Sequence, residues 1–369
     1  MDRRAHRLDD RDRVLLIRLG AVGDVLRTLP ALHLIRKNFP STHLAWLVED
    51  LARDLLEGHP EIDAVIRFPR REMRAAAGQP HRMAACLAAL RRDLRAMRFT
   101  VALDFQGSFK SGALALLSGA PRRVGFAPGH CRELSFLFTN EWVRPGSRRL
   151  NRVEKNCVLA ESLGAAGDEI EVVLPERPEE GNEADALLRA LNPGGAPVVV
   201  LSPGTSRRQR SKRWPPENFG RLASLLAASS GALPLVVFGP GEEALARSIV
   251  SESGKRAVLT PPTSLRLLAS LLRRAALFVG ADTGPMHLAW SVGCPVVALF
   301  GPTDPRLNAP LGPGHVILKS GNSMAGITPG QAFEAAHGLL PRRPATAGAA
   351  APPRLSRAAL FPRAAGAGR

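Results

Sequence analysis

The chain contains no tyrosine, and phenylalanine and tryptophan together bring its aromatic content to only 5%. Surfaces that stack nucleobases interleave aromatic side chains with basic ones. This scarcity therefore disfavours specific nucleic-acid binding, even though the formal net charge is +17. Because the basic residues are spread along the chain, an acidic substrate or an anionic membrane surface fits the charge better.

Cysteine is also scarce, and no Cys-x-x-Cys pair occurs. The spacing indicates neither a zinc site nor a disulfide framework, so we expect reduced thiols in the core. No group of His, Cys and Asp has the spacing of metal ligands, and we expect neither a catalytic metal nor another cofactor. The four cysteines are Cys86, Cys131, Cys157 and Cys294.

Long hydrophobic runs are missing as well. No stretch of about eighteen apolar residues could span a bilayer, and residues 1–13 lack the apolar core of a secretory signal. We therefore expect a cytoplasmic protein that is at most peripheral at the inner face of the plasma membrane.

The 369 residues, with 45% hydrophobic and 22% charged residues, are enough for two α/β domains. Apolar strand patterns alternate with helical patterns in both halves, which predicts two Rossmann-like domains with parallel sheets. The predicted divisions are a basic extension (1–13), an N-terminal domain (14–175), a linker region with one short helix (176–197), a C-terminal domain (198–340) and a disordered Arg/Ala/Pro tail (341–369).

The most informative stretch is FVGADTGPMHLAWSVGCPVVALFGPTDP, from Phe278 to Pro305. It reads as strand, helix start at Asp282, helix and strand. Pro285 gives up a donor that would be unpaired anyway, while Thr283 and Gly284 leave backbone N–H groups that can face an anion. His287 follows one turn later and could reach the same ligand. The alternatives are a plain helix cap and a buried structural histidine.

A second turn, Gly20-Ala21-Val22-Gly23-Asp24, follows the first predicted strand and precedes a helix expected to reach about Asn38. It is neither a dinucleotide fingerprint nor a Walker loop. Gly23 lets the backbone turn sharply, and Asp24 can serve either as an N-cap or as a general base for an attacking hydroxyl.

Three further polar groups follow predicted strands. Hydroxyls and a lysine suit a departing diphosphate, two glutamates at a helix start can bind ribose hydroxyls, and cations can bind an anionic acceptor. A solvated loop, helix-dipole partners and ordinary surface charges are the respective alternatives. The groups are Thr205, Ser206 and Lys212; Glu242 and Glu243; and Asp104, Gln106, Lys110 and Arg132.

Five blocks in this order resemble glycosyltransferase family 9, the ADP-heptose:lipopolysaccharide heptosyltransferases, over about Val14 to Leu340. The blocks are RLGAVGDVLRTLPALHLIRKNFP, DFQGSFKS, SPGTS with KRWPPENFGRLA, FGPGEE, and DTGPMHLAWSVGCPVVALFGPTDP.

The resemblance implies a GT-B fold, with two Rossmann-like domains facing across a cleft, and metal-independent transfer with inversion at the anomeric carbon. The implied partners are an ADP-sugar donor, a lipid-linked anionic saccharide acceptor and the inner membrane surface. The implied catalytic residues are Asp24 as base and Lys212, and those for the donor are Thr205, Ser206, Glu242 or Glu243, Asp282, Thr283, Gly284 and His287. The implied acceptor-side cations are Lys110 and Arg132, and we add Gly23, Asp104 and Gln106 to the predicted acceptor site because they follow strands on the same edge.

Three rival interpretations remain at this point. A family member could use another nucleotide sugar for a different surface polysaccharide. A GT-B sugar-nucleotide epimerase would need further carboxylates and no acceptor. A non-catalytic nucleotide-sugar-binding protein would use Asp24 only as a helix cap.

Overall fold

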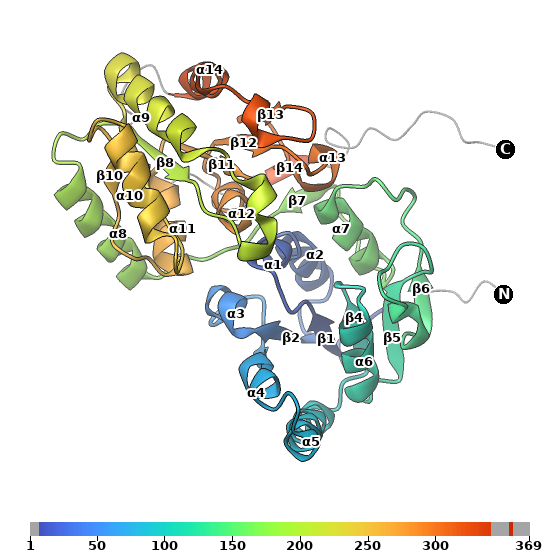
Figure 1. Cartoon of the computed structure of the whole chain (residues 1–369). Coiled ribbons are helices and arrows are strands. Elements are labelled where there is room, and N and C mark those ends of the chain that lie inside the picture. Colours follow the sequence, from blue (N-terminus) through green and yellow to red (C-terminus); the bar gives the residue numbers. More distant parts are fainter. Residues whose placement is uncertain (1–6, 341–353, 357–369) are drawn as a thin grey trace. The chain divides into compact units, whose positions relative to one another are not determined.

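The computed structural model describes residues 7–340 and 354–356, and the chain divides into two compact units between Asp168 and Glu169. Each unit holds one six-stranded parallel sheet covered by helices (Figure 1). The predicted α/β class with two parallel sheets is thus confirmed. The segment 176–197, predicted as a linker, lies in the second unit, and its helix α8 runs from Pro178 to Leu191.

The sheet of the first unit has the strand order β3-β2-β1-β4-β5-β6. Since β1 is hydrogen-bonded to β2 on one side and to β4 on the other, the order reverses beside β1. Open parallel sheets bind ligands outside the carboxyl ends of the strands at this switch point. The strands are β1 (Arg13–Ile17), β2 (His43–Glu49), β3 (Ala64–Phe68), β4 (Val101–Asp104), β5 (Arg122–Phe126) and β6 (Glu141–Val143).

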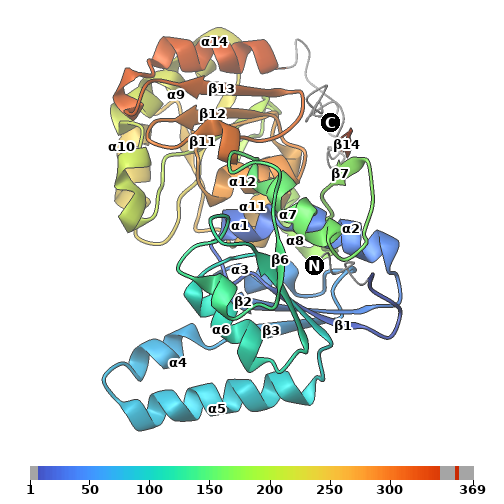
Figure 2. The same ribbon diagram turned by 90° about the vertical axis from the view of Figure 1, so that its right-hand side faces the viewer.

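Helices cover both faces of this sheet. Leu15 and Ile17 of β1 point to one face, where they pack in one core with Leu94 of α5 and Leu114 of α6. The alternate residues of β1 point to the other face, and α2 and α7 pack against each other on that side (Figure 2). The helices are α1 (Val22–Leu26), α2 (Leu29–Asn38), α3 (Asp50–Leu56), α4 (Arg70–Ala75), α5 (Pro80–Ala96), α6 (Phe109–Leu117), α7 (Arg152–Glu161) and the 3-10 turn η1 (Ser135–Leu137).

The second unit repeats this topology with the order β10-β9-β8-β11-β12-β13, so its switch point lies between β8 and β11. Neighbouring strands of this six-stranded sheet are parallel, and its strands β8, β11 and β12 are buried throughout, as expected for the middle of a sheet covered on both faces. The strands are β8 (Val198–Ser202), β9 (Leu233–Val236), β10 (Val258–Leu259), β11 (Leu277–Ala281), β12 (Val296–Phe300) and β13 (His315–Lys319).

The helices of this unit form two groups. One group packs with the sheet through a core that includes Phe219 and Ile249, while α8 and α11 pack together through Ala184 and Leu271. The helices are α9 (Pro216–Ser230), α10 (Glu243–Glu252), α11 (Leu265–Arg274), α12 (Gly284–Ser291), α13 (Pro305–Asn308), α14 (Pro329–Leu339) and the 3-10 turns η2 (Arg207–Lys212) and η3 (Met324–Gly326).

The structure differs from the sequence-based expectations in three places. The helix expected up to Asn38 is two helices, and Pro30 lies in the first turn of the second one, where its missing N–H costs no bond. The stretch 139–151, for which the sequence predicted no strand, contains the edge strand β6. Strand β13 and helix α14 were not expected, although they extend the second sheet and cover it.

The predicted disordered tail lies mostly outside the described residues. Its described part, Arg354–Ser356, forms strand β14, which pairs antiparallel with β7 (Glu169–Glu171). Leu355 lies against Gly312, and Arg354 forms an ion pair with Glu171. For these three residues the structure differs from the prediction, because backbone pairing, the contact of Leu355 with Gly312 and the ion pair of Arg354 hold them.

Candidate functional site

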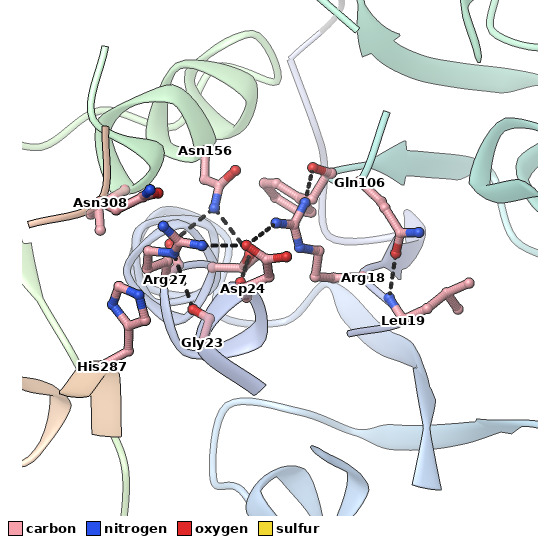
Figure 3. Close-up of polar contacts among 12 residues, drawn as sticks. Arg18, Leu19, Gly23, Asp24, Arg27, Gln106, Asn156, His287 and Asn308 are labelled. Carbon is pink, nitrogen blue, oxygen red and sulfur yellow. Dashed lines mark hydrogen bonds and ion pairs between the residues drawn. The ribbon is translucent and has the colours of Figure 1, made fainter. Parts of the chain in front are cut away.

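Asp24 follows the switch-point turn of the first unit. It is the third residue of α1, whose N-cap is Ala21, so the alternative that Asp24 caps this helix does not hold. Its side chain is 31% exposed, and Oδ1 lies 2.9 Å from an Arg18 guanidinium nitrogen and also contacts Arg27 (Figure 3). The carboxylate is therefore held from two sides and remains accessible.

The two arginines that hold Asp24 are themselves buried and anchored. Arg18 donates at 2.6 Å to the carbonyl of Phe105, in the loop that follows β4, and Arg27 donates to the carbonyl of Gly23. Burial lowers the pKa of Arg18, and the charge of Asp24 opposes this effect. Sequence reasoning missed both residues. The sequence signals for them were the charge of Arg18 at the end of an apolar strand and the i,i+3 spacing of Asp24 and Arg27 on the predicted helix.

The loop after β4 shapes the neighbouring edge. Asp104 is fully buried, and its Oδ1 accepts hydrogen bonds from the backbone N–H groups of Gln106 and Gly107. Gln106 in turn accepts a bond from the N–H of Leu19 at 3.0 Å, which joins the loops after β1 and β4 (Figure 3). Asp104 and Gln106 therefore build the edge, and the carboxyl group of Asp104 is not exposed to a ligand.

The two predicted acceptor cations lie in different surroundings. Lys110 is paired with Glu49 at 2.9 Å and lies over the ring of Phe68. Arg132 is exposed, and its charge acts on Arg152 and Lys155. Burial and these neighbouring positive charges lower the pKa of Lys155 to about 8.

In the second unit, three of the predicted residues come together at the carboxyl end of β11. Lys212 Nζ lies 2.9 Å from Asp282 Oδ2, and His287 Nε2 lies 3.3 Å from Asp282 Oδ1. Asn308, which sequence reasoning missed and no sequence signal indicated, donates to the same carboxylate at 3.2 Å. All three partners satisfy a carboxylate that is only 5% exposed.

Charge balance at this cluster favours an ionised Asp282. Burial alone would raise its pKa, but the hydrogen bond and charge of His287, together with the charge of Lys212, hold it far below the usual range. Thr283 is the N-cap of α12, and Gly284 is its first helical residue. The first-turn N–H groups of a helix have no partner within it, so this end of α12 can donate to an anion.

A second connected group surrounds the loop after β8. Arg213, which sequence reasoning also missed, donates at 3.1 Å to the hydroxyl of buried Thr205 and lies 3.6 Å from Glu242. Glu242 also accepts a bond from the N–H of Gly239, and it lies against Gly204, where a Cβ would meet its carboxylate at 1.9 Å. Gly204 therefore leaves the space that the carboxylate occupies.

The remaining predicted residues of this loop and helix point elsewhere. Glu243 is 52% exposed and pairs with Arg247 one turn along α10. Ser206 is exposed at the start of η2, and its carbonyl accepts a bond from Gln209. Of the two glutamates, Glu242 is the one that joins the group around Thr205.

Neither a metal-binding cluster nor a membrane-spanning helix is present in the described residues. No group of three or more His, Cys, Asp and Glu side chains is placed to hold a metal ion within residues 7–340 and 354–356. In the same part of the chain, none of the helices combines the length and the apolar character that crossing a membrane requires.

The chain is similar to known proteins over most of its length. The family model of glycosyltransferase family 9 (heptosyltransferase) matches residues 87–330. Lipopolysaccharide heptosyltransferase 1 of Escherichia coli O18:K1:H7 is 30% identical over 86% of this chain and 94% of its own length.

Solved structures agree in fold. The structure of the E. coli heptosyltransferase WaaC with ADP has a TM-score of 0.72 at 28% identity, covering 89% of this chain and 99% of the other. The same enzyme with ADP-2-deoxy-2-fluoro heptose has a TM-score of 0.71 at 28% identity, covering 88% and 99%. The resemblance that the motifs indicated is confirmed: this chain is a glycosyltransferase and belongs to family 9, the heptosyltransferase family.

Proposed function

We propose that the protein transfers a heptose from ADP-heptose to the inner core of lipopolysaccharide, with inversion at the anomeric carbon and without a metal ion. The relatives named above support the donor and the acceptor, since one is a lipopolysaccharide heptosyltransferase and another was solved with an ADP-heptose analogue. The acceptor is then lipid-linked, and the enzyme works at the cytoplasmic face of the membrane.

The observation that carries the proposal is the environment of Asp24. A general base must be accessible to the hydroxyl that it deprotonates and must be oriented towards it. Asp24 is partly exposed at the switch point of the first sheet, and Arg18 and Arg27 fix its direction from buried positions. Asp24 takes the proton of the acceptor hydroxyl as that oxygen attacks the anomeric carbon.

The second unit supplies the groups for the departing ADP. As the bond between the sugar and the diphosphate breaks, negative charge grows on the phosphate oxygens, and cations and N–H donors stabilise it. Lys212 and the first turn of α12 provide these groups. Asp282 holds Lys212 in place, and His287 holds Asp282, so the cation is positioned before the donor binds.

Glu242 is proposed to bind the ribose of the donor. A carboxylate can accept hydrogen bonds from both ribose hydroxyls, and Glu242 lies beside Gly204 and Thr205 in the loop that follows β8. Glu243 faces solvent with Arg247 and takes no part.

The acceptor side is proposed to use positive charge. The charges of Arg132, Arg152 and Lys155 act on one another, and the charge of Asp24 acts on Arg152. Such a group suits the acidic sugar of an inner core. Lys110, bound to Glu49, contributes from the loop side.

The test replaces Asp24 by Asn, which keeps the size of the side chain and removes its basicity. We expect turnover, measured as ADP release with donor and acceptor, to fall by about 10²- to 10⁴-fold, while the Kd for ADP stays within about twofold. Asp93→Asn, at a carboxylate in the same unit that is 63% exposed, is the matched control. Unchanged turnover in Asp24→Asn would reject the base assignment. Release of a nucleoside diphosphate only from a different nucleotide sugar would reject ADP-heptose as the donor. Conversion of the donor without an acceptor would reject transfer itself.

A further inference from the structure

Large apolar side chains are exposed mainly in one stretch of the first unit. Nine large hydrophobic residues are exposed in the described part of the chain, and five of them fall between residues 109 and 142. We define the apolar patch as Phe109, Leu134, Leu137 and Trp142, which are 53%, 57%, 63% and 54% exposed. The fifth, Leu116, follows Phe109 by seven residues and so lies on the same side of α6.

Contacts between adjoining elements bring the patch residues together. The N–H of Phe109 donates to the carboxylate of Glu133, next to Leu134, and the ring of Phe109 meets that of Phe138 edge to face at 4.8 Å. The 3-10 turn η1 packs against α6 and β5. Figure 2 shows α6 and β6 on the side of this unit that faces the viewer.

Trp142 is fixed over the same turn. Its indole N–H donates to the carbonyl oxygens of Phe136 and Thr139, both at 3.2 Å, and its ring meets that of Phe136 edge to face. The polar edge of the indole is thereby satisfied by the protein while more than half of the side chain stays exposed. A rigid, exposed aromatic side chain of this kind suits the interface between water and lipid.

The stretch that carries the patch is strongly basic. Residues 105–150 contain seven Lys and Arg residues and two acidic residues, a net charge of +5. Both acids are engaged within the protein, Glu133 by the N–H of Phe109 and Glu141 by Arg122. The exposed cations Arg132, Arg144, Arg148 and Arg149 follow the patch residues in the chain or lie between them.

These cations continue towards Asp24. Lys155 donates at 2.5 Å to the carbonyl oxygen of His130, and the charges of Lys155, Arg148 and Arg144 all act on that histidine. The charges of Arg152 and Arg18 act in turn on Lys155. Arg18 contacts Asp24 directly. A series of positive charges thus runs from the apolar patch to the proposed catalytic base.

We propose that the apolar patch and its cations dock the protein on an anionic phospholipid bilayer. Apolar side chains enter the interface, and arginines bind lipid phosphates, each contributing attraction near a negative surface. A second copy of the chain fits this surface less well, because two faces of the same strong charge would repel each other. The inference rests on the proposed function in one respect, because a protein that acts on a lipid-linked acceptor must reach it at the membrane surface.

The tryptophans provide a direct readout. Of the four in the chain, Trp46, Trp214 and Trp290 are at most 1% exposed, so iodide quenching of fluorescence reports on Trp142. We expect vesicles of phosphatidylglycerol and phosphatidylethanolamine to protect Trp142 from iodide. Vesicles of phosphatidylcholine alone should protect it far less. The proposal would be overturned if iodide still quenched Trp142 in vesicle-bound protein. It would also be overturned if the protein dimerised and Trp142 was protected from iodide without vesicles.

The matched variants test the patch by vesicle sedimentation with the full chain. Leu137→Gln/Trp142→Gln should weaken binding to anionic vesicles by at least about tenfold, since each side chain buries a large apolar surface. Leu225→Gln/Ile317→Gln, at exposed apolar residues of the second unit, should change it by less than about twofold. Equal losses in both pairs would overturn the assignment of the surface.

Arg144→Gln/Arg148→Gln should lower binding and flatten its dependence on salt. Unchanged salt dependence would count against the role of the cations. Sedimentation needs neither donor nor acceptor, so it tests the docking surface independently of the transferase activity. If the protein bound anionic vesicles as expected but transferred no heptose, the proposed function would be refuted and the docking surface would not. Transfer to a water-soluble acceptor should be unaffected by Leu137→Gln/Trp142→Gln.

Discussion

Two neighbouring glutamates, Glu242 and Glu243, allow a controlled test of the donor site, because they are adjacent in the sequence but lie in different environments. Glu242 is 16% exposed and contacts Gly239 and Arg213, whereas Glu243 is 52% exposed on the outer side of α10. If Glu242 accepts both ribose hydroxyls, Glu242→Gln converts one of two acceptor oxygens into a donor and removes the charge.

The expected magnitude follows from the bonds that are lost. Hydrogen bonds to a charged group contribute about 1.5–3 kcal/mol, which corresponds to a roughly 10- to 100-fold weaker Kd for ADP. Glu243→Gln should change the Kd by less than about twofold, since its partner is an exposed arginine. Isothermal titration calorimetry with ADP measures both values, and thermal unfolding without ligand confirms that both variants are folded.

A backbone position gives an independent version of the same test. At Gly204 a Cβ would meet Glu242 Oε2 at 1.9 Å, so Gly204→Ala must displace the carboxylate. We expect Gly204→Ala to weaken ADP binding as much as Glu242→Gln does, and the two changes together to be less than additive. Equal losses in Glu242→Gln and Glu243→Gln, or none in either, would refute the ribose assignment.

Two further predictions concern buried charges. Lys212→Met leaves Asp282 buried without its ammonium partner, so the free energy of unfolding should fall by about 3 kcal/mol. Urea denaturation measures this decrease, and a decrease of less than about 1 kcal/mol would show that the ion pair is replaceable. Burial raises the pKa of Asp104 to about 6, above the ordinary 3.8. The unfolded chain therefore releases this proton at lower pH than the folded one, and the stability that Asp104 contributes is present below pH 4 and lost as the pH rises through 6. Urea titrations between pH 3.5 and 7 should show this decline in the native protein and a flatter curve in Asp104→Asn; parallel curves would contradict it.

Much of the fold was predictable from local patterns. Apolar runs of four to six residues, each followed by small or polar residues and then a helical period, predict parallel strands whose carboxyl ends carry Asp24, Thr205 and Asp282. These signals are local, so the sequence alone placed the candidate residues on one edge of each sheet. The edge strands β6 and β13 were not predicted, because short, partly exposed edge strands show no strong alternation of apolar and polar residues.

Tertiary structure alone decided which side chains meet. Lys212 and Asp282 are seventy residues apart, and Asn308 joins them from another helix, so no spacing predicts their contact. The orientation of α10 turns Glu242 inward and Glu243 outward. Arg18 is held beside Asp24 by its bond to the carbonyl of Phe105 in the loop after β4, whereas Arg27 meets Asp24 locally, one helical turn further along α1. Pattern determines where a chemical group stands along a strand or helix, whereas partners, burial and charge depend on how separate elements pack.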